Sequence, residues 1–155
     1  MDQLVISIDD PRVGDMHALL TRHLAFAYEH TPPADVHALD LNGLLDPAVT
    51  TYSARRGGQL LGIGALKELD ETHAELKSMH TAEAARQQGV GRAMLDHLVG
   101  VARQRGYRRV SLETGTMEAF APARSLYANA GFVPCDPFGD YRLSPSSAFM
   151  TLFLR

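Results

Sequence analysis

The sequence predicts a mixed α/β domain, residues 1–155, in which about seven strands form one mostly antiparallel sheet with helices on both faces. Two observations favour this class. Stretches rich in β-forming residues alternate along the chain with stretches in which apolar residues recur at helical spacing. One strand-helix-strand passage also requires a parallel crossover, whereas a Gly-Gly pair marks an antiparallel hairpin. With 155 residues and 45% hydrophobic residues, the chain is long enough for one well-packed domain.

Local patterns predict the elements of the first third. Residues 4–8 (LVISI) are rich in β-formers and stop at Asp-Asp-Pro, so we expect a strand. Apolar residues then recur at helical spacing, which predicts an amphipathic helix over residues 13–29. Pro32 and Pro33 must break it, because proline cannot continue the hydrogen-bond ladder. We expect a second helix over residues 34–45.

The middle of the chain predicts three successive antiparallel strands. Residues 49–54 and 59–66 flank the turn at residues 55–58, which contains Gly-Gly and is typical of a hairpin. Residues 69–73 then turn the chain into a third strand over residues 74–81.

The last third predicts a helix over residues 90–105, a strand over residues 110–114 parallel to the strand at 74–81, and a helix over residues 118–130. A short segment at 132–134 and a last strand at 149–154 follow. The complete order is β, α, α, β, β, β, α, β, α, β, β.

Composition excludes several classes of protein. The net charge of -3 and the pI of about 6.1 argue against a nucleic-acid partner. The sequence contains no apolar run long enough for a bilayer and no secretory leader, so we expect a cytoplasmic protein without a membrane partner. Cys135 is the only cysteine, which rules out an intramolecular disulfide and fits a reducing compartment. The oligomeric state stays open, a homodimer included.

A glycine-rich turn between a strand and a helix is the most informative stretch. Residues 75–91 (ELKSMHTAEAARQQGVG) contain the strand, a loop of small residues and the start of the next helix. The first amides of a helix lack partners and carry partial positive charge, so they suit an anion. Gly89 and Gly91 have no Cβ to block the approach of that anion. The turn therefore predicts a cradle for a diphosphate, with a turn that holds no ligand as the alternative.

Two better-known phosphate motifs do not fit this turn. The dinucleotide fingerprint needs a third glycine where Met94 stands, and the Walker motif needs Gly-Lys-Ser/Thr where the chain has Gly91-Arg92-Ala93.

Two motifs carry a family resemblance. Arg86-x-x-Gly89-x-Gly91 resembles the Q/R-x-x-G-x-G/A signature of the GNAT superfamily of acetyl-CoA-dependent N-acetyltransferases. The stretch ARSLYANAGF at residues 123–132 resembles that family's second signature, A-x-x-L-Y-x-x-x-G-F. The resemblance covers nearly the whole chain and implies the GNAT fold, splayed at its parallel strand pair around the coenzyme A site. More narrowly, the chain is similar to small bacterial acetyltransferases with provisional labels such as auxin or phosphinothricin (herbicide) acetyltransferase.

The resemblance implies how acetyl-CoA, as co-substrate, would bind. The main-chain N–H of Met79 would donate to the developing oxyanion, and the main chain of residues 79–81 would contact the pantetheine arm. Tyr127 would protonate the leaving sulfur, with an aromatic packing role as the alternative. The residues implied in coenzyme binding are Met79, His80, Thr81, Arg86, Gln87, Gln88, Gly89, Val90, Gly91, Arg92 and Tyr127. Phe120 departs from the family, which often has asparagine there, so coenzyme contacts from this helix are in doubt.

Glu75 is the first candidate for the general base. It stands four residues before Met79, where some family members carry a catalytic glutamate, and a period of two gives it a face in common with Lys77 and Met79. The alternative is an ion pair with Lys77. His80 and Glu113 are second candidates.

The acceptor is expected to be the amine of a small molecule or an amino acid, attacked directly in a ternary complex. By analogy with the fold, His30, Pro32, Pro33, Glu113 and Tyr141 would border its pocket. We expect no metal, because prolines interrupt the histidines spaced six or seven residues apart and no zinc motif accompanies them. A non-catalytic acyl-CoA sensor and a nucleotide-binding protein are the competing interpretations.

Overall fold

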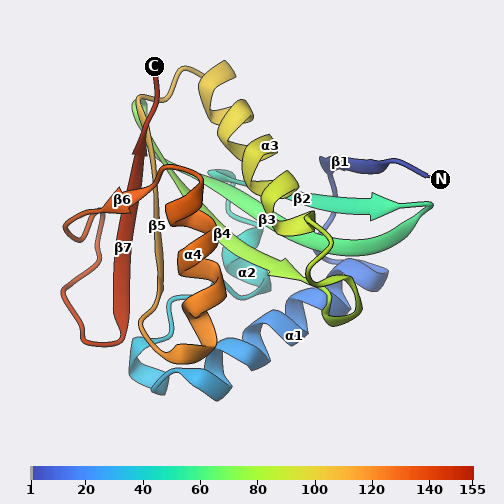
Figure 1. Cartoon of the computed structure of the whole chain (residues 1–155), viewed down its shortest axis with the longest axis horizontal. Coiled ribbons are helices and arrows are strands. Elements are labelled where there is room, and N and C mark those ends of the chain that lie inside the picture. Colours follow the sequence, from blue (N-terminus) through green and yellow to red (C-terminus); the bar gives the residue numbers. More distant parts are fainter. Residues whose placement is uncertain (1) are drawn as a thin grey trace.

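A computed structural model describes residues 2–155 and shows a seven-stranded sheet with helices packed on both of its faces (Figure 1). The strands lie in the order β1-β2-β3-β4-β5-β7-β6. The strands are β1 (Leu4–Ile8), β2 (Val49–Arg56), β3 (Gln59–Asp70), β4 (His73–Thr81), β5 (Arg109–Gly115), β6 (Val133–Pro134) and β7 (Ser147–Phe153). The helices are α1 (Gly14–His30), α2 (Leu41–Leu44), α3 (Val90–Gln104) and α4 (Ala121–Asn129), with 3₁₀ turns η1 (Pro33–Asp35), η2 (Glu83–Ala85) and η3 (Glu118–Phe120). The element order and the mixed sheet confirm the predicted fold class.

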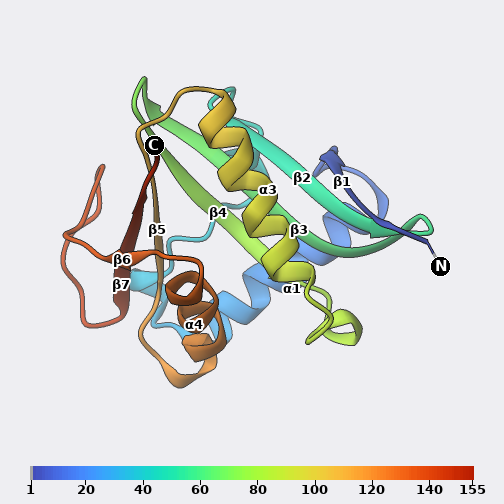
Figure 2. The ribbon, with the colours of Figure 1, turned by 45° about the horizontal axis from the view of Figure 1, so that its top comes forward.

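The sheet separates two helical layers. Helices α3 and α4 lie on one face, and α1 and α2 lie on the other (Figures 1 and 2). The larger apolar cluster joins the sheet to α3 and α4, and the smaller one joins it to α1 and α2. The side chains that α3 buries in this cluster include Val90, Met94, Leu98 and Ala102, each at most 2% exposed. Each large apolar side chain buried in this way contributes about 1.5–3 kcal/mol to folding.

The hairpin between β2 and β3 is tighter than predicted. Both strands continue to the turn, which consists of Gly57 and Gly58 alone. Their φ angles of +59° and +81° suit a two-residue primed turn, which glycine adopts without strain. The hairpin from β3 to β4 is equally short: β3 runs on to Asp70, whose side chain accepts a hydrogen bond from the N–H of Thr72 at 2.8 Å.

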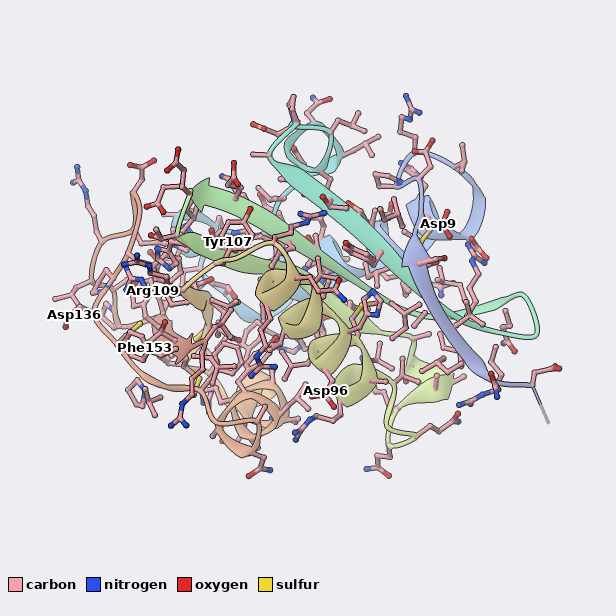
Figure 3. All side chains as sticks on the ribbon, turned by 90° about the horizontal axis from the view of Figure 1, so that it is seen from above. Asp9, Asp96, Tyr107, Arg109, Asp136 and Phe153 are labelled. Carbon is pink, nitrogen blue, oxygen red and sulfur yellow. The ribbon has the colours of Figure 1, made fainter. Side chains whose placement is uncertain are left out.

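Polar contacts fix the outer parts of the sheet. Asp9 follows β1, and its carboxylate pairs with Arg55 of β2 at 3.1 Å (Figure 3). Tyr107 follows α3, and its hydroxyl donates to Glu68 of β3 at 2.6 Å. These contacts join segments that lie 39 and 46 residues apart.

Two glycines let α3 lie close to the sheet. A Cβ on Gly64 would stand 2.8 Å from Met94 and 2.9 Å from Met79, and a Cβ on Gly62 would stand 2.9 Å from Val90. Any larger residue at these positions would push α3 away from β3. The depth at which the N-terminal half of α3 sits therefore depends on β3.

The parallel pair, β4 with β5, is joined over only three residue pairs. His73 pairs with Arg109, and the last pair is Glu75 with Ser111. Beyond Glu75 the two strands separate, while β4 stays paired with β3 and β5 with β7. The predicted splay of the sheet at its parallel pair is confirmed.

A β-bulge in β4 corrects one prediction about side-chain direction. Lys77 pairs with Ala65 and His80 with Ile63, so Ser78 and Met79 together oppose Gly64. Ser78 has a φ of +56°, which marks the extra residue. The expectation that Met79 shares a face with Glu75 and Lys77 is wrong, because the extra residue turns Met79 towards α3.

The segment after α1 also differs from its prediction. No continuous helix spans residues 34–45: η1 gives way to an extended stretch, and α2 has only four residues. Asp40 is the physical reason, since its carboxylate caps the N–H of Gly43 at 2.8 Å and starts the helix there. The extended stretch leaves the carbonyl of His37 free to accept a hydrogen bond from Lys77 at 3.1 Å.

The remaining helices agree with their predictions to within a few residues, except that residues 118–120 form η3 before α4 begins. Across residues 2–155, no helix has the length and apolar character needed to cross a membrane.

Candidate active site

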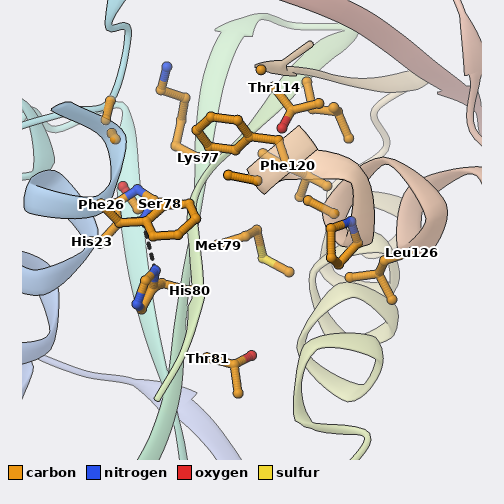
Figure 4. Close-up of a pocket in the computed structure, with 18 of the residues that line it drawn as sticks. His23, Phe26, Lys77, Ser78, Met79, His80, Thr81, Thr114, Phe120 and Leu126 are labelled. Carbon is orange, nitrogen blue, oxygen red and sulfur yellow. Dashed lines mark hydrogen bonds between the residues drawn. The ribbon is translucent and has the colours of Figure 1, made fainter. Parts of the chain in front are cut away.

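A cavity of about 780 Å³ opens where β4 and β5 separate (Figure 4). Its walls come from both layers, because α1 and η1 line it on one side of the sheet and α3, η3 and α4 on the other. The volume is within the range of small-molecule sites in proteins, about 300–1,000 Å³. We call the part next to α3 and α4 the donor half, and the part next to α1, η1, β5 and η3 the acceptor half.

The loop before α3 has the features of an anion site. Gln87 and Gly89 both have positive φ, +64° and +80°, so successive amides turn towards a common point. Gly89 is the N-cap residue of the fifteen-residue α3, and no side chain in the described part of the chain (2–155) caps this end of the helix. The first turn of α3 contains no acidic residue. Free amides and a helix dipole therefore meet here, as the sequence predicts for a diphosphate.

The side chains around this loop point in different directions. Arg86 and Gln87 line the cavity, and so do Val90 and Thr81. Arg92 does not line it, since its guanidinium pairs with Asp96 one turn later at 2.9 Å. Gln88, Gly89 and Gly91 are also absent from the lining, and the Gln88 amide donates to the carbonyl of Ala84 at 3.3 Å.

The bulge places unusual main chain at the centre of the cavity. Ser78, Met79 and His80 all line it. The buried hydroxyl of Ser78 has no hydrogen-bond partner within residues 2–155. A bulge interrupts the regular ladder, so main-chain groups of this segment become available to a molecule lying along β4. This arrangement fits the predicted role of the Met79 N–H, which stays a prediction.

Tyr127 of α4 contributes the phenol of the donor half. It lines the cavity, is 6% exposed, and its ring packs against Phe132 with centroids 5.9 Å apart. Burial, with a smaller effect from the Glu113 carboxylate, raises the pKa of the phenol above its usual value. The hydroxyl therefore keeps its proton at neutral pH and can donate it. Both the packing role and the proposed acid role are compatible with this geometry.

Glu75 lies outside the cavity lining, in a buried polar network. Its carboxylate accepts a hydrogen bond from the Tyr141 hydroxyl and pairs with Lys77 Nζ at 3.3 Å. The Glu75 and Lys77 side chains are 3% and 9% exposed. Lys77 Nζ also donates to the Tyr141 hydroxyl at 2.8 Å and to the His37 carbonyl at 3.1 Å. The three donors of this ammonium group are thus all used.

Glu113 of β5 has a different environment from Glu75. Its side chain lines the cavity, and within residues 2–155 neither an ion pair nor a well-formed hydrogen bond holds its carboxylate. Burial raises the pKa of the Glu113 carboxyl, and the nearby Ser147, His37 and Lys77 offset part of that shift. A carboxylate with a raised pKa and a free face is a suitable proton acceptor.

Two histidines meet on the wall formed by α1 and β4. His23 Nδ1 and His80 Nδ1 are 3.2 Å apart, so one ring donates and the other accepts (Figure 4). Burial lowers the pKa of His23 to about 3 and that of His80 to about 4, each with smaller effects from neighbouring cationic groups. Both rings are therefore neutral at pH 7.

Aromatic rings from distant segments complete the acceptor half. Phe26 of α1 lies edge-on to Phe120 of η3, with centroids 5.4 Å apart, and His30 lies 4.5 Å from Phe26 (Figure 4). The Phe120 ring covers Gly115 at the end of β5, where any Cβ would collide with it. The residue that departs from the family pattern therefore forms part of a ring pair that spans both layers.

The structure brings most of the predicted site residues together. Those that line the cavity are Met79, His80, Thr81, Arg86, Gln87, Val90, Tyr127, His30 and Glu113, whereas Glu75, Gln88, Gly89, Gly91, Arg92, Pro32, Pro33 and Tyr141 do not. Sequence reasoning missed Phe26 and Asp35, which also line it. A signal for Phe26 was present, since His23, Phe26 and His30 recur at helical spacing.

Comparison with known sequences gives concordant matches. A model of the acetyltransferase (GNAT) family matches residues 14–132. The Bacillus subtilis protein called uncharacterized N-acetyltransferase YsnE is 46% identical over 146 residues, covering 94% of this chain and 97% of that protein. The Escherichia coli protein called uncharacterized N-acetyltransferase YedL is 45% identical over 149 residues, covering 96% and 94%. An IAA acetyltransferase from Azospirillum brasilense is 36% identical over 132 residues, covering 84% and 83%.

Solved structures share the fold. A Klebsiella pneumoniae protein assigned as an acyl-CoA N-acyltransferase superposes with a TM-score of 0.83 at 27% identity, covering 99% of both chains. A GNAT family acetyltransferase from Elizabethkingia anophelis, solved with acetyl-CoA bound, superposes with a TM-score of 0.73 at 18% identity, covering 99% of this chain and 100% of that one. Because the Elizabethkingia anophelis protein is only 18% identical, its similarity to this chain concerns the fold alone.

Proposed function

The chain belongs to the GNAT family and is an N-acetyltransferase, and from that premise we propose that it transfers the acetyl group of acetyl-CoA to the amine of a small molecule. The amine attacks the thioester directly in a ternary complex. One observation carries this proposal: the uncapped start of α3, the bulge of β4 and the Tyr127 phenol all border one continuous cavity.

The donor half would hold the coenzyme through main chain. The amides at residues 87–91 suit the pyrophosphate, and Arg86 adds a positive charge on the lining. The pantetheine arm would extend along the freed edge of β4, beside residues 79–81. The Met79 N–H would stabilise the oxyanion that forms when the acceptor nitrogen bonds to the carbonyl carbon.

Tyr127 would act as the acid. As the bond between carbon and sulfur breaks, the phenol gives its proton to the departing thiolate and later recovers one from solvent. Its raised pKa keeps it protonated until that step, and such proton transfers contribute about 10²–10⁴-fold to rate.

Glu113 would accept the proton that the acceptor nitrogen must lose. We prefer it to Glu75 because Glu113 lines the cavity with a free carboxylate, whereas Lys77 and Tyr141 occupy Glu75. Glu75 as base stays a prediction that variants can decide. In the arrangement proposed here, Glu75 positions Lys77 and Tyr141.

Calorimetric titration and a thiol-release assay test the proposal together. Acetyl-CoA should bind with measurable heat and raise the melting temperature, ATP should not compete with it, and a panel of small amines should release free thiol from acetyl-CoA. Binding without release for any amine would favour the acyl-CoA sensor. Competition by ATP at similar concentrations would favour a nucleotide site at α3.

A further inference from the structure

We propose that the acceptor is a primary amine with an apolar, ring-bearing body and without a carboxylate, and therefore that free amino acids are excluded. This inference rests on the proposed acetyl transfer and narrows its substrate class. The argument comes from the charges and the rings that line the acceptor half.

The acceptor half offers negative charge to a ligand. Glu113 lines it with a carboxylate that no cation of residues 2–155 holds in an ion pair. Asp35 of η1 also lines it, and within residues 2–155 the one side-chain hydrogen bond that its carboxylate accepts comes from the Ser146 hydroxyl, at 2.9 Å. An ammonium group entering beside η1 and Ser146 therefore meets two carboxylates.

The cations on the lining are not available to a carboxylate. Among residues 2–155, the lysine and arginine side chains on the lining are Lys77 and Arg86. Lys77 uses all three donors within the protein, to Glu75, Tyr141 and the His37 carbonyl. Arg86 precedes the glycine turn, in the donor half, where phosphate groups would occupy it. A ligand carboxylate in the acceptor half would therefore meet no free lysine or arginine there, and the side chains left to consider on the lining are the imidazoles of His23, His30, His37 and His80.

The histidine pair does not supply that missing charge. His23 and His80 are neutral at pH 7, because burial disfavours their protonated forms. If one ring were protonated, the second would be harder to protonate, because the two Nδ1 atoms are only 3.2 Å apart.

The rest of the acceptor half suits an apolar body. Phe26 and Phe120 face each other edge to face across the two layers, and both line the cavity with Ala119 and Pro122. Contact with a further aromatic ring is favourable for such a pair beyond the apolar area that the ring buries. A ring held between α1 and η3 would leave an attached amine free to reach Glu113 and the bulge of β4.

A carboxylate on the same ligand would be penalised twice. It would lose its water without a partner, and it would lie near Glu113 and Asp35. The geometry thus separates amines from amino acids of the same shape.

Matched acceptors test this selectivity. Phenethylamine and phenylalanine differ by one carboxylate, and phenethylamine and butylamine differ by the ring. For the wild-type protein we expect kcat/KM for phenethylamine to exceed kcat/KM for phenylalanine by at least about 30-fold, the loss that follows from one unpaired buried charge. We expect kcat/KM for phenethylamine to exceed kcat/KM for butylamine by about tenfold, because butylamine lacks the ring.

Variants locate the selectivity in named residues. Glu113→Gln keeps the shape of the side chain and removes its charge, so the ratio of phenethylamine to phenylalanine should fall at least about fivefold. The ratio cancels any common loss of rate from proton transfer. Phe120→Leu should reduce the ratio of phenethylamine to butylamine and leave the carboxylate ratio unchanged. Glu71→Gln, in the exposed turn between β3 and β4, is the matched control and should change neither ratio.

The outcomes separate this inference from the proposed function. Equal or better turnover of phenylalanine would overturn the inference while acetyl transfer stands. A carboxylate ratio that Glu113→Gln leaves at its wild-type value would also overturn it. Binding of acetyl-CoA with no turnover of any amine would overturn the proposed function, and the inference with it.

Discussion

The donor half of the cavity is formed largely by main chain, whereas the acceptor half is formed largely by side chains. The donor half presents main chain, with the amides before α3 and the bulge of β4, and it needs few particular side chains. The acceptor half presents side chains from α1, η1, β5 and η3, of which Phe26, Glu113 and Phe120 do most to shape it. A site made of main chain suits a donor that stays the same, and a site made of side chains can change its acceptor while the sheet remains intact. Substitutions in the two halves should therefore have different effects, and the largest expected effect comes first.

Replacing the phenol of the donor half should cause the largest loss. We expect Tyr127→Phe to lower kcat by about 10²–10³-fold, because the thiolate loses its proton donor. Coenzyme affinity, measured by calorimetry, should be unchanged, because the phenyl ring keeps its contact with Phe132. A kcat within twofold of the wild-type value would remove Tyr127 from the mechanism.

The two glutamates, Glu113 on the cavity lining and Glu75 in the buried network, should respond differently to the same substitution. Glu113→Gln should lower kcat by about 10²-fold with little change in stability. Glu75→Gln should instead destabilise the protein by about 3 kcal/mol, since Lys77 would lose its charged partner in a buried place. Rate measurements and urea denaturation on both variants distinguish the roles. The reverse pattern, a stable but inactive Glu75→Gln, would restore Glu75 as the base.

Filling the glycine beneath α3 should disturb the donor half moderately. A methyl group at Gly64 would stand 2.8 Å from Met94 and 2.9 Å from Met79, so we expect Gly64→Ala to cost about 1–3 kcal/mol. The KM for acetyl-CoA should rise, while the preference among acceptors should stay the same. Gly100→Ala in α3, where a Cβ would meet no other described residue within 4 Å outside its own turn of helix, is the control.

Acid should weaken the wall formed by α1 and β4, an effect that is absent at neutral pH because both histidines are already neutral there. His23 and His80 have lowered pKa values in the folded protein, about 3 and 4, so the unfolded chain binds more protons below about pH 6.5. Stability contributed by the neutral pair is complete above pH 6.5 and declines as the pH falls towards 4. For each histidine the slope approaches about 1.4 kcal/mol per pH unit.

Denaturation at several pH values measures this slope. His23→Leu should flatten the acidic decline, whereas His17→Leu on the exposed side of α1 should not. Identical declines in the two variants would show that the pair does not control acid stability.

The same contrast explains what could be predicted from the sequence. The order of elements and the glycine turn depend on neighbours in the chain, such as Arg86, Gly89 and Gly91, so local patterns predicted them. The splay of the sheet was predicted from the family resemblance that these motifs carry. The acceptor half depends on residues that meet only after folding: Phe26 and Phe120 are far apart in the sequence, and neither motif names them. The extra residue at Ser78 also escaped prediction, because a polar residue in a strand does not by itself indicate a positive φ.

That extra residue shifts the phase of β4. Before Ser78, the odd-numbered side chains point towards α1, and after it the even-numbered ones do, so a single strand supplies Lys77 and His80 to one layer and Leu76 and Met79 to the other. Deleting one residue between Lys77 and His80 would remove the bulge, and Met79 and His80 would keep the faces that they occupy now. The main chain that the bulge frees beside the cavity would return to the ladder with β3, so both compartments of the enzyme would lose this segment through a single codon.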